Sequence, residues 1–253
     1  MAEIGLPRSD EPFDFRHQAR RYARYRRDYS AALYDAIAAR TGPAEGRSAV
    51  DVGCGTGFVA RALEARGWRA VGVDFSAPML REACTGAALC LVQARGEALP
   101  LRDASVELVA CGTSFHWLAP APALAEFARV LVPGGWAALF WRYPILGEPS
   151  VHVVGDVLRR FGQDVDAAMR LVHTPAPFAD SAFRPEPGEV IATSLRFTAA
   201  EFHGYVSTVE WLRRITGAQH AAFLDALREE LERRHPDGVL EHCQEHLFLG
   251  RRV

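Results

Sequence analysis

Three alternating glycines and two acidic residues lie within the stretch AVDVGCGTGFVARALEARGWRAVGVDFS. Gly53, Gly55 and Gly57 follow the first apolar run, and glycine lets a backbone turn sharply and approach a ligand without a Cβ clash. Asp51 opens this turn, and Asp74 ends the second apolar run. An acid at the end of a second strand can accept hydrogen bonds from both hydroxyls of a ribose. The pattern therefore predicts a nucleotide-type ligand at the carboxyl ends of two neighbouring strands.

Short apolar runs and helical stretches alternate around this turn. We expect helices at 57–66, 77–84 and 120–131, and strands at SAVDVG, RAVGVDF, ALCLVQA, VELVACG and WAALFWR. Strands separated by helices imply an α/β fold with a doubly wound, mostly parallel sheet and helices on both faces.

The regions on either side of this core are also expected to be ordered. The spacing of Phe15, Ala19 and Tyr22 predicts one helix over 14–40, and TGPAEG after it is a breaker. Prolines punctuate the region that follows the fifth strand, which we expect to mix helix and loop. In the rest of the chain we expect mixed helix and loop at 143–200, helices near 200–213 and 218–234, and a closing strand in HCQEHLFLGRRV.

Composition excludes several kinds of chemistry. All 29 basic residues are arginine, which excludes a Walker-type phosphate loop and a pyridoxal Schiff base. A net charge of −2 gives no broad basic field for nucleic acid. The first residues lack the order of a signal peptide and no apolar run is long enough to span a bilayer, so a cytoplasmic protein is expected. The five cysteines form no CxxC pair, and no metal site is expected.

In these motifs the chain resembles the class I S-adenosylmethionine-dependent methyltransferases. DVGCGTG matches their first motif, (D/E)xGxGxG, at every position, and VGVDFS matches the second. EALPLRDASVELV resembles the segment that leads into their fourth strand, and RVLVPGG resembles the turn before the fifth. The resemblance implies a Rossmann-like core with helical lid elements over the carboxyl ends of the strands. It also implies S-adenosylmethionine as cofactor and S-adenosylhomocysteine as product.

The resemblance divides the chain into three parts and assigns the cofactor site. The parts are an amino-terminal helical cover (1–44), a cofactor-binding core (45–142), and an acceptor-pocket insertion with closing helices and strand (143–253). The expected cofactor residues are Asp51, Gly53, Gly55, Asp74, Phe75, Met79, Gly96, Glu97, Tyr22 and Arg26. In these proteins the residue at Asp74 holds the ribose, and the one at Phe75 stacks on the adenine.

One departure from the family concerns the adenine. Many relatives carry an acid after the third strand, whereas QARGEALP places Arg95 and Gly96 near that point. Either Gly96 and Glu97 offer backbone groups to the adenine, or Glu97 is a solvated surface acid.

The acceptor side is expected in GTSFHWL, after the fourth strand. Its FHW triplet resembles a subfamily that acts on small molecules and includes the trans-aconitate methyltransferase-like proteins. His116 is a candidate general base, because imidazole titrates in the right range. The alternative is a structural imidazole that bonds a backbone carbonyl beside a packed Trp117. Further acceptor-side candidates are Trp117, Tyr25, Trp141 and Tyr143.

The leading interpretation is an enzyme that transfers a methyl group from S-adenosylmethionine to an oxygen, nitrogen or carbon atom of a small molecule. A composition typical of a GC-rich genome suggests a tailoring step in secondary metabolism. A monomer or homodimer is expected, with neither nucleic acid nor membrane as partner. Two alternatives remain: a non-methylating S-adenosylmethionine-binding protein, and a nicotinamide-dependent oxidoreductase on the same fold.

Overall fold

The computed structural model describes residues 15–85, 89–163 and 177–253. The chain is organised in two compact units, each assembled from several stretches of sequence. The sheet unit contains the described parts of 27–142, 175–191 and 245–253, and the helical unit contains those of 1–26, 143–174 and 192–244.

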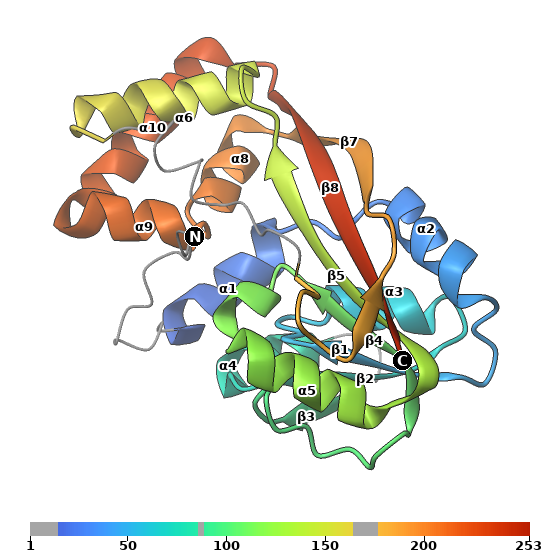
Figure 1. The fold of residues 1–253 in the computed structure, drawn as a ribbon. Coiled ribbons are helices and arrows are strands. Elements are labelled where there is room, and N and C mark those ends of the chain that lie inside the picture. Colours follow the sequence, from blue (N-terminus) through green and yellow to red (C-terminus); the bar gives the residue numbers. More distant parts are fainter. Residues whose placement is uncertain (1–14, 86–88, 164–176) are drawn as a thin grey trace. The chain divides into compact units, whose positions relative to one another are not determined.

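The sheet follows the order β3-β2-β1-β4-β5-β8-β6, and β7 pairs with β8 (Figure 1). Parallel pairing links β1 to β2 and β4, β2 to β3, and β4 to β5, whereas β6 and β8 are antiparallel. The strands are β1 (Ser48–Val52), β2 (Arg69–Asp74), β3 (Cys90–Gln93), β4 (Val106–Gly112), β5 (Leu131–Pro144), β6 (Phe183–Pro185), β7 (Glu189–Phe197) and β8 (Val239–Arg252). The expected α/β fold with a mostly parallel sheet is confirmed.

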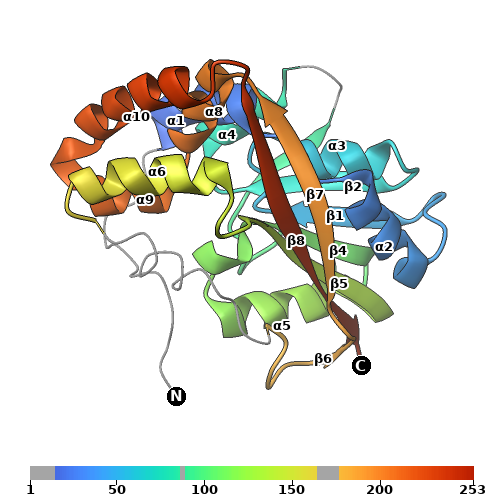
Figure 2. The ribbon, with the colours of Figure 1, turned by 90° about the horizontal axis from the view of Figure 1, so that it is seen from above.

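Helices cover both faces of the sheet within the sheet unit (Figure 2). Helices α2 (Ala31–Thr41) and α3 (Phe58–Glu64) lie on one face, and α5 (Pro120–Val130) lies on the other. Alternate residues of a strand point to opposite faces, so each strand supplies apolar side chains to both layers. The layer under α2 and α3 includes the buried side chains of Leu33, Ile37, Ala49, Val59, Leu63, Leu108, Ala110, Ala138 and Phe140.

Strand register brings the ends of the central strands to one edge. Val52 pairs with Val73, and Asp51 pairs with both Gly72 and Ala110. The carboxyl ends of β1, β2 and β4 therefore lie side by side, which is where ligands bind in open α/β sheets.

The helical unit has an apolar core of its own. Its helices are α1 (Phe15–Tyr25), α6 (Pro149–Arg160), α8 (Ala199–Val206), α9 (Glu210–Thr216) and α10 (His220–Arg234). Among the side chains buried together are those of Val153, Val157, Leu158, Phe202, Leu212, Phe223, Leu227 and Leu231.

Three expectations about these elements were wrong. The single helix expected over 14–40 is two helices, because Ser30 has an extended backbone and its side chain caps α2 by accepting from the Leu33 amide. The region 143–200, expected to mix helix and loop, also contains strands β6 and β7. Strand β5 also starts earlier than expected, because PGG lies within the strand rather than before it.

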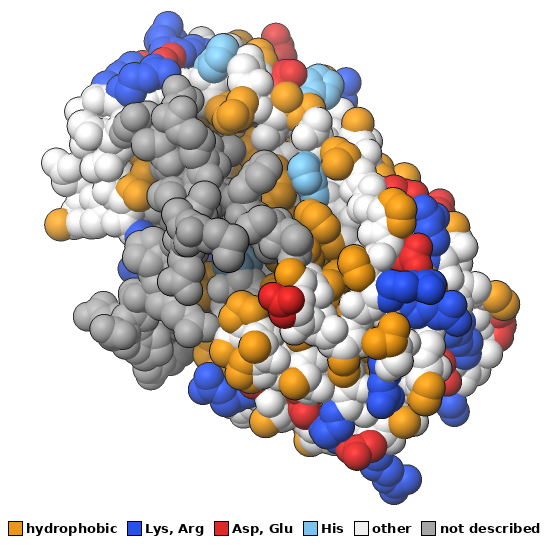
Figure 3. All heavy atoms as spheres, viewed as in Figure 1, with side chains coloured by type: hydrophobic (Ala, Val, Ile, Leu, Met, Phe, Trp, Pro, Cys, Tyr) orange, Lys and Arg blue, Asp and Glu red, His pale blue; other side chains and the backbone are white. Residues whose placement is uncertain are grey.

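Charged side chains of both signs lie intermixed on the face in Figure 3. Among the described residues, no helix has the length and hydropathy needed to cross a bilayer.

Candidate cofactor and acceptor site

The glycine turn joins β1 to α3 in a conformation that requires glycine. Gly53, Gly55 and Gly57 have φ angles of +70°, +54° and +82°, a region that residues with a Cβ rarely adopt. A Cβ on Gly53 would lie 2.5 Å from the Cβ of Ser114, which follows β4. Both the backbone angle and the close approach of a neighbouring turn therefore exclude a larger residue at position 53.

Asp74 ties this turn to the end of β2. Its Oδ2 accepts from the Gly55 amide at 2.9 Å, and its Oδ1 accepts from the Ser76 amide at 2.8 Å. Burial raises the pKa of the Asp74 carboxyl, and these two backbone hydrogen bonds act in the opposite direction. Each carboxylate oxygen has a second lone pair, so Asp74 can still accept hydrogen bonds from a ligand.

Asp51 lies beneath the turn. It is 1% exposed, and its Oδ2 accepts from the Ala60 amide of α3 at 3.0 Å. Burial is the main cause that raises the pKa of this carboxyl to about 8. Asp51 therefore anchors the first turn of α3, and the direct cofactor contact expected of it remains a prediction.

The residues expected near the adenine surround the end of β2. Phe75 is 52% exposed, although it is a large apolar side chain. Gly96 is packed closely, since a Cβ there would lie 2.9 Å from Leu118 and Val52 side-chain atoms. The Glu97 Oε1 accepts from the Ala119 amide at the start of α5, at 2.9 Å. This bond holds the Glu97 carboxylate to the start of α5, and the role expected of Glu97 at the adenine remains a prediction.

The turn after β4 carries the candidate acceptor residues. Ser114 Oγ donates to Val52 O at 2.7 Å, which joins this turn to the end of β1. Thr113 has a φ of +49°, an unusual value for a β-branched residue. A short 3₁₀ helix from Phe115 to Trp117 follows at once. The turn therefore places His116 and Trp117 at the same edge of the sheet as the glycine turn.

His116 is bonded through one ring nitrogen to a buried tryptophan. Trp141 Nε1 lies 3.3 Å from His116 Nδ1, and Trp141 is only 3% exposed. An indole N–H can only donate, so Nδ1 must be the acceptor and the neutral imidazole carries its proton on Nε2. The Trp117 ring, 38% exposed, lies beside the imidazole with 5.0 Å between ring centroids. This tautomer leaves Nε2 as a hydrogen-bond donor rather than a base.

Known proteins match the same part of the chain. The model of a methyltransferase domain family matches residues 50–139. An uncharacterized methyltransferase of Mycobacterium tuberculosis is 34% identical over 174 residues, which cover 68% of this chain and 68% of the relative. The chain belongs to the methyltransferase family.

Solved structures show the fold of this methyltransferase as well. A structure assigned as a type II methyltransferase of Anaeromyxobacter dehalogenans has a TM-score of 0.62 at 24% identity, covering 90% of this chain and 98% of the other. A geranyl diphosphate methyltransferase, solved in complex with S-adenosylmethionine, has a TM-score of 0.50 at 20% identity, covering 96% and 93%. The protein is a class I S-adenosylmethionine-dependent methyltransferase.

The residues at the glycine turn fit this cofactor. A Cβ built on Gly55 would approach only the Met79 methyl group, at 3.4 Å, so the space beside the turn is open. Thr56 Oγ1 within the turn is buried and has no hydrogen-bond partner among the described residues. A carboxylate at Asp74 and an exposed ring at Phe75 suit a ribose and a base. The structure brings six of the expected cofactor residues of the methyltransferase to one edge: Gly53, Gly55, Asp74, Phe75, Met79 and Gly96.

Four expected site residues lie in the helical unit: Tyr22, Tyr25, Arg26 and Tyr143. Arg26 donates to Thr208 Oγ1 at 2.8 Å, and its guanidinium carbon lies 5.0 Å from the centres of both the Tyr22 and Tyr205 rings. The Tyr25 ring packs on Gly204 of α8, where a Cβ would lie 2.5 Å from it. Tyr143 follows Arg142 in β5 and is half-buried. The roles of Tyr22, Tyr25, Arg26 and Tyr143 in binding ligands remain predictions.

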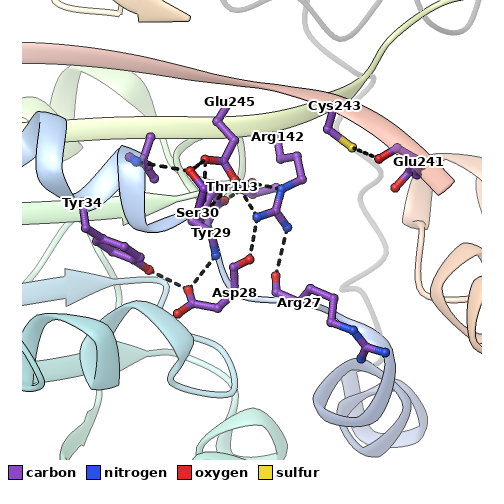
Figure 4. Close-up of polar contacts among 11 residues, drawn as sticks. Arg27, Asp28, Tyr29, Ser30, Tyr34, Thr113, Arg142, Glu241, Cys243 and Glu245 are labelled. Carbon is purple, nitrogen blue, oxygen red and sulfur yellow. Dashed lines mark hydrogen bonds and ion pairs between the residues drawn. The ribbon is translucent and has the colours of Figure 1, made fainter. Parts of the chain in front are cut away.

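Sequence reasoning missed a polar network at the end of β5. The Arg142 side chain, 10% exposed, pairs with the fully buried Glu245 of β8 at 2.6 Å (Figure 4). Glu245 also accepts from the amide and hydroxyl of Ser30. A signal was present, because Glu245 has the same parity along β8 as the buried Cys243, Leu247 and Leu249. An acid at an inward position of a strand needs a buried cationic or donor partner.

Metal ligands do not cluster in the parts of the chain that the structure describes. There, no three His, Cys, Asp or Glu side chains are grouped so that they could hold an ion.

Proposed function

We propose that this methyltransferase acts on a small molecule whose accepting atom is nucleophilic without the help of a base. When bound, S-adenosylmethionine supplies a methyl group on a positively charged sulfur, so the protein has mainly to align donor and acceptor. The single observation that carries the proposal is the hydrogen bond from Trp141 to His116 Nδ1. A carboxylate or an uncharged amine fits a site in which His116 donates from Nε2.

His116 and Trp117 would hold the acceptor in this proposal. The Nε2–H group of His116 donates to an oxygen of the acceptor and orients it, which leaves the lone pair of the attacking atom free. The exposed ring of Trp117 packs against the apolar part of the acceptor. Protonation of His116 would place an N–H on Nδ1 against the indole N–H, so the imidazole must stay neutral to keep this arrangement.

The other proposed assignments rest on the resemblance to the family. Residues 1–44 would cover the cofactor, with Tyr22 and Arg26 toward it, and 143–253 would complete the acceptor pocket with Tyr25 and Tyr143. Trp141 would support that pocket from beneath through its bond to His116. The small-molecule preference agrees with the net charge of −2, and a tailoring step in secondary metabolism is the biological context that we propose.

The first test concerns the donor site. S-adenosylhomocysteine, titrated into the protein in a calorimeter, should bind while NAD does not. Asp74→Ala should weaken binding by about 1–3 kcal/mol, the scale of lost hydrogen bonds to a charged group. Asp35→Ala, on the exposed face of α2, is the matched control. Binding of NAD, or equal affinity in the two variants, would show that the donor assignment is wrong.

The second test concerns His116. Small carboxylates, amines and alcohols are screened for release of S-adenosylhomocysteine, and the variants His116→Gln and His116→Ala are compared on the best acceptor. Glutamine can donate from a nitrogen near the position of Nε2 but is not a base. We therefore expect the His116→Gln variant to retain turnover that the His116→Ala variant loses, with cofactor affinity unchanged in both. Equal loss in the two variants, with alcohols as the preferred acceptors, would establish the general-base alternative.

A further inference from the structure

A strained residue lies at the start of the acceptor turn. Thr113 is β-branched and yet has a φ of +49°, a conformation that persists only where the surroundings impose it. Two hydrogen bonds hold it there. Its amide donates to Phe140 O at 2.8 Å, and its Oγ1 lies 2.5 Å from the hydroxyl oxygen of Tyr29.

Contacts on several sides fix Tyr29 in turn. Its ring meets Phe140 edge to face, with centroids 4.7 Å apart, and the Arg142 guanidinium lies over the ring at 5.0 Å. Its amide donates to Asp28 Oδ1 at 2.7 Å, and that oxygen also accepts from Tyr34 at 2.7 Å. The Tyr29 hydroxyl is therefore presented to Thr113 by a side chain that has little freedom to move.

The backbone that carries Tyr29 is held by the ion pair of Arg142 and Glu245 (Figure 4). Arg142 donates to the carbonyl oxygens of Arg27 and Asp28, at 3.1 and 2.5 Å. Glu245 accepts from the Ser30 hydroxyl at 2.5 Å. Residues 27–30 are thus bonded to two strands, β5 and β8, and we call this segment with Arg142 and Glu245 the strand clamp.

We propose that Tyr29 is a positioning residue for methyl transfer. The strand clamp holds its hydroxyl against Thr113, and Thr113 sets the course of the turn that carries His116. The inference rests on the proposed function only in taking His116 as the group that orients the acceptor. Loss of the Tyr29 hydroxyl releases Thr113 from its strained conformation, and the imidazole then leaves Trp141.

The test uses Tyr29→Phe, which removes one oxygen atom. Its matched control is Tyr34→Phe, which also removes a hydroxyl bonded to the clamp but has no bond to Thr113. The primary readout is the pair of imidazole ¹⁵N signals of His116 in the complex with S-adenosylhomocysteine, assigned by their absence from the His116→Gln spectrum. These signals report the tautomer directly, and a purely structural role for Tyr29 would leave them unchanged.

We expect the Nδ1 signal of His116 to lose, in Tyr29→Phe, the shift that comes from accepting the Trp141 hydrogen bond, while Tyr34→Phe keeps it. S-adenosylhomocysteine affinity should be equal in both variants. On an acceptor found by screening, Tyr29→Phe should lower kcat by on the order of tenfold and leave the KM for S-adenosylmethionine unchanged.

A second variant separates positioning from damage to the fold. Thr113→Gly in the Tyr29→Phe background adopts the positive φ without strain, so it should restore both the signals and kcat. Wild-type His116 signals in Tyr29→Phe, or no recovery in the double variant, would overturn the inference. The ¹⁵N readout needs no acceptor, so failure of the inference is distinguishable from failure of the proposed function, which the binding and screening tests decide.

Discussion

At the scale of single residues, two acids near the glycine turn have different environments. Asp74 keeps part of its hydrogen-bonding capacity for a ligand, while Asp51 is enclosed by protein and bonded to α3. A carboxyl removed from water favours its neutral form, which is why the pKa of Asp51 is raised so far. This difference makes Asp51 a group that couples the stability of the protein to pH.

The ligand-free protein should lose stability as the pH rises toward 8. Folded Asp51 holds its proton up to about pH 8, whereas in the unfolded chain the same group ionises near its ordinary value of 3.8. Between these values the folded state binds more protons, so the free energy of unfolding falls as pH increases. From about pH 7 to pH 8 the loss should approach ~1 kcal/mol, since one proton contributes about 1.4 kcal/mol per pH unit.

Urea unfolding of wild type and Asp51→Asn over this pH window checks the expectation. Asparagine keeps an acceptor for the Ala60 amide but does not titrate, so the slope should flatten in that variant. His203 and His220 have lowered pKa values, so their contribution to the slope has the opposite sign to that of Asp51. Both histidines are present in the two proteins, so the difference between the slopes belongs to Asp51. Parallel slopes in the two proteins would mean that Asp51 is already ionised in the fold.

At the scale of elements, the glycine turn and the turn after β4 share one space. Ser114 bonds to the end of β1 and leaves no room for a side chain on Gly53. Parallel strands β1 and β4 are neighbours, so their following turns must pass close to each other. The glycine turn and the turn that carries His116 and Trp117 are therefore built against one another.

Gly53→Ala should destabilise the protein more than Gly46→Ala. Both glycines have a positive φ, +70° and +77°, but a Cβ on Gly46 meets nothing within 4 Å. In the Gly46 variant only the strained backbone conformation lowers the free energy of unfolding, by about 1–2 kcal/mol. The Gly53 variant must also move Ser114, which we expect to add at least ~1 kcal/mol, the lower range for overpacking.

Thermal unfolding of both variants gives the comparison, with S-adenosylhomocysteine titration as a second measurement. Gly46→Ala should bind the ligand as wild type does, and Gly53→Ala should not. Similar melting temperatures for the two variants would mean that Ser114 moves aside at no cost.

At the scale of the whole molecule, one buried ion pair lies where several stretches of chain meet. Arg142 and Glu245 come from β5 and β8, and both bond to the segment before α2. Removing one member of a buried pair leaves the other charge in a poorly solvated place. The pair should therefore matter far more to stability than the exposed pairs of this arginine-rich chain.

Arg142→Met should lower the free energy of unfolding by about 3–5 kcal/mol, the usual cost of an orphaned buried charge. Arg228→Met, which breaks the exposed pair with Asp225, should cost less than ~1 kcal/mol. The double variant Arg142→Met with Glu245→Met removes both charges and should recover part of the loss. Denaturant unfolding monitored by tryptophan fluorescence measures the free energy of unfolding of all three variants. Equally small losses of stability for Arg142→Met and Arg228→Met would contradict the burial of the Arg142–Glu245 pair.

The parallel strands β1 to β5, the glycine turn and the place of Asp74 could all be predicted from the sequence. These features depend on local patterns, since apolar runs, glycine spacing and an acid at a strand end are read from neighbouring residues. The methyltransferase family and its cofactor followed from the same motifs and were confirmed. The trans-aconitate-like subfamily and the roles of individual site residues stay predictions.

The partners of the buried polar side chains became known only from the folded structure. The pairing of Arg142 with Glu245 and the bond from Trp141 to His116 join residues far apart in the chain. No local pattern specifies such contacts, because they arise where separate strands end at the same edge. The tautomer of His116, and with it the chemistry that we propose, is set by a tryptophan on β5, a strand that follows His116 in the chain by more than one element.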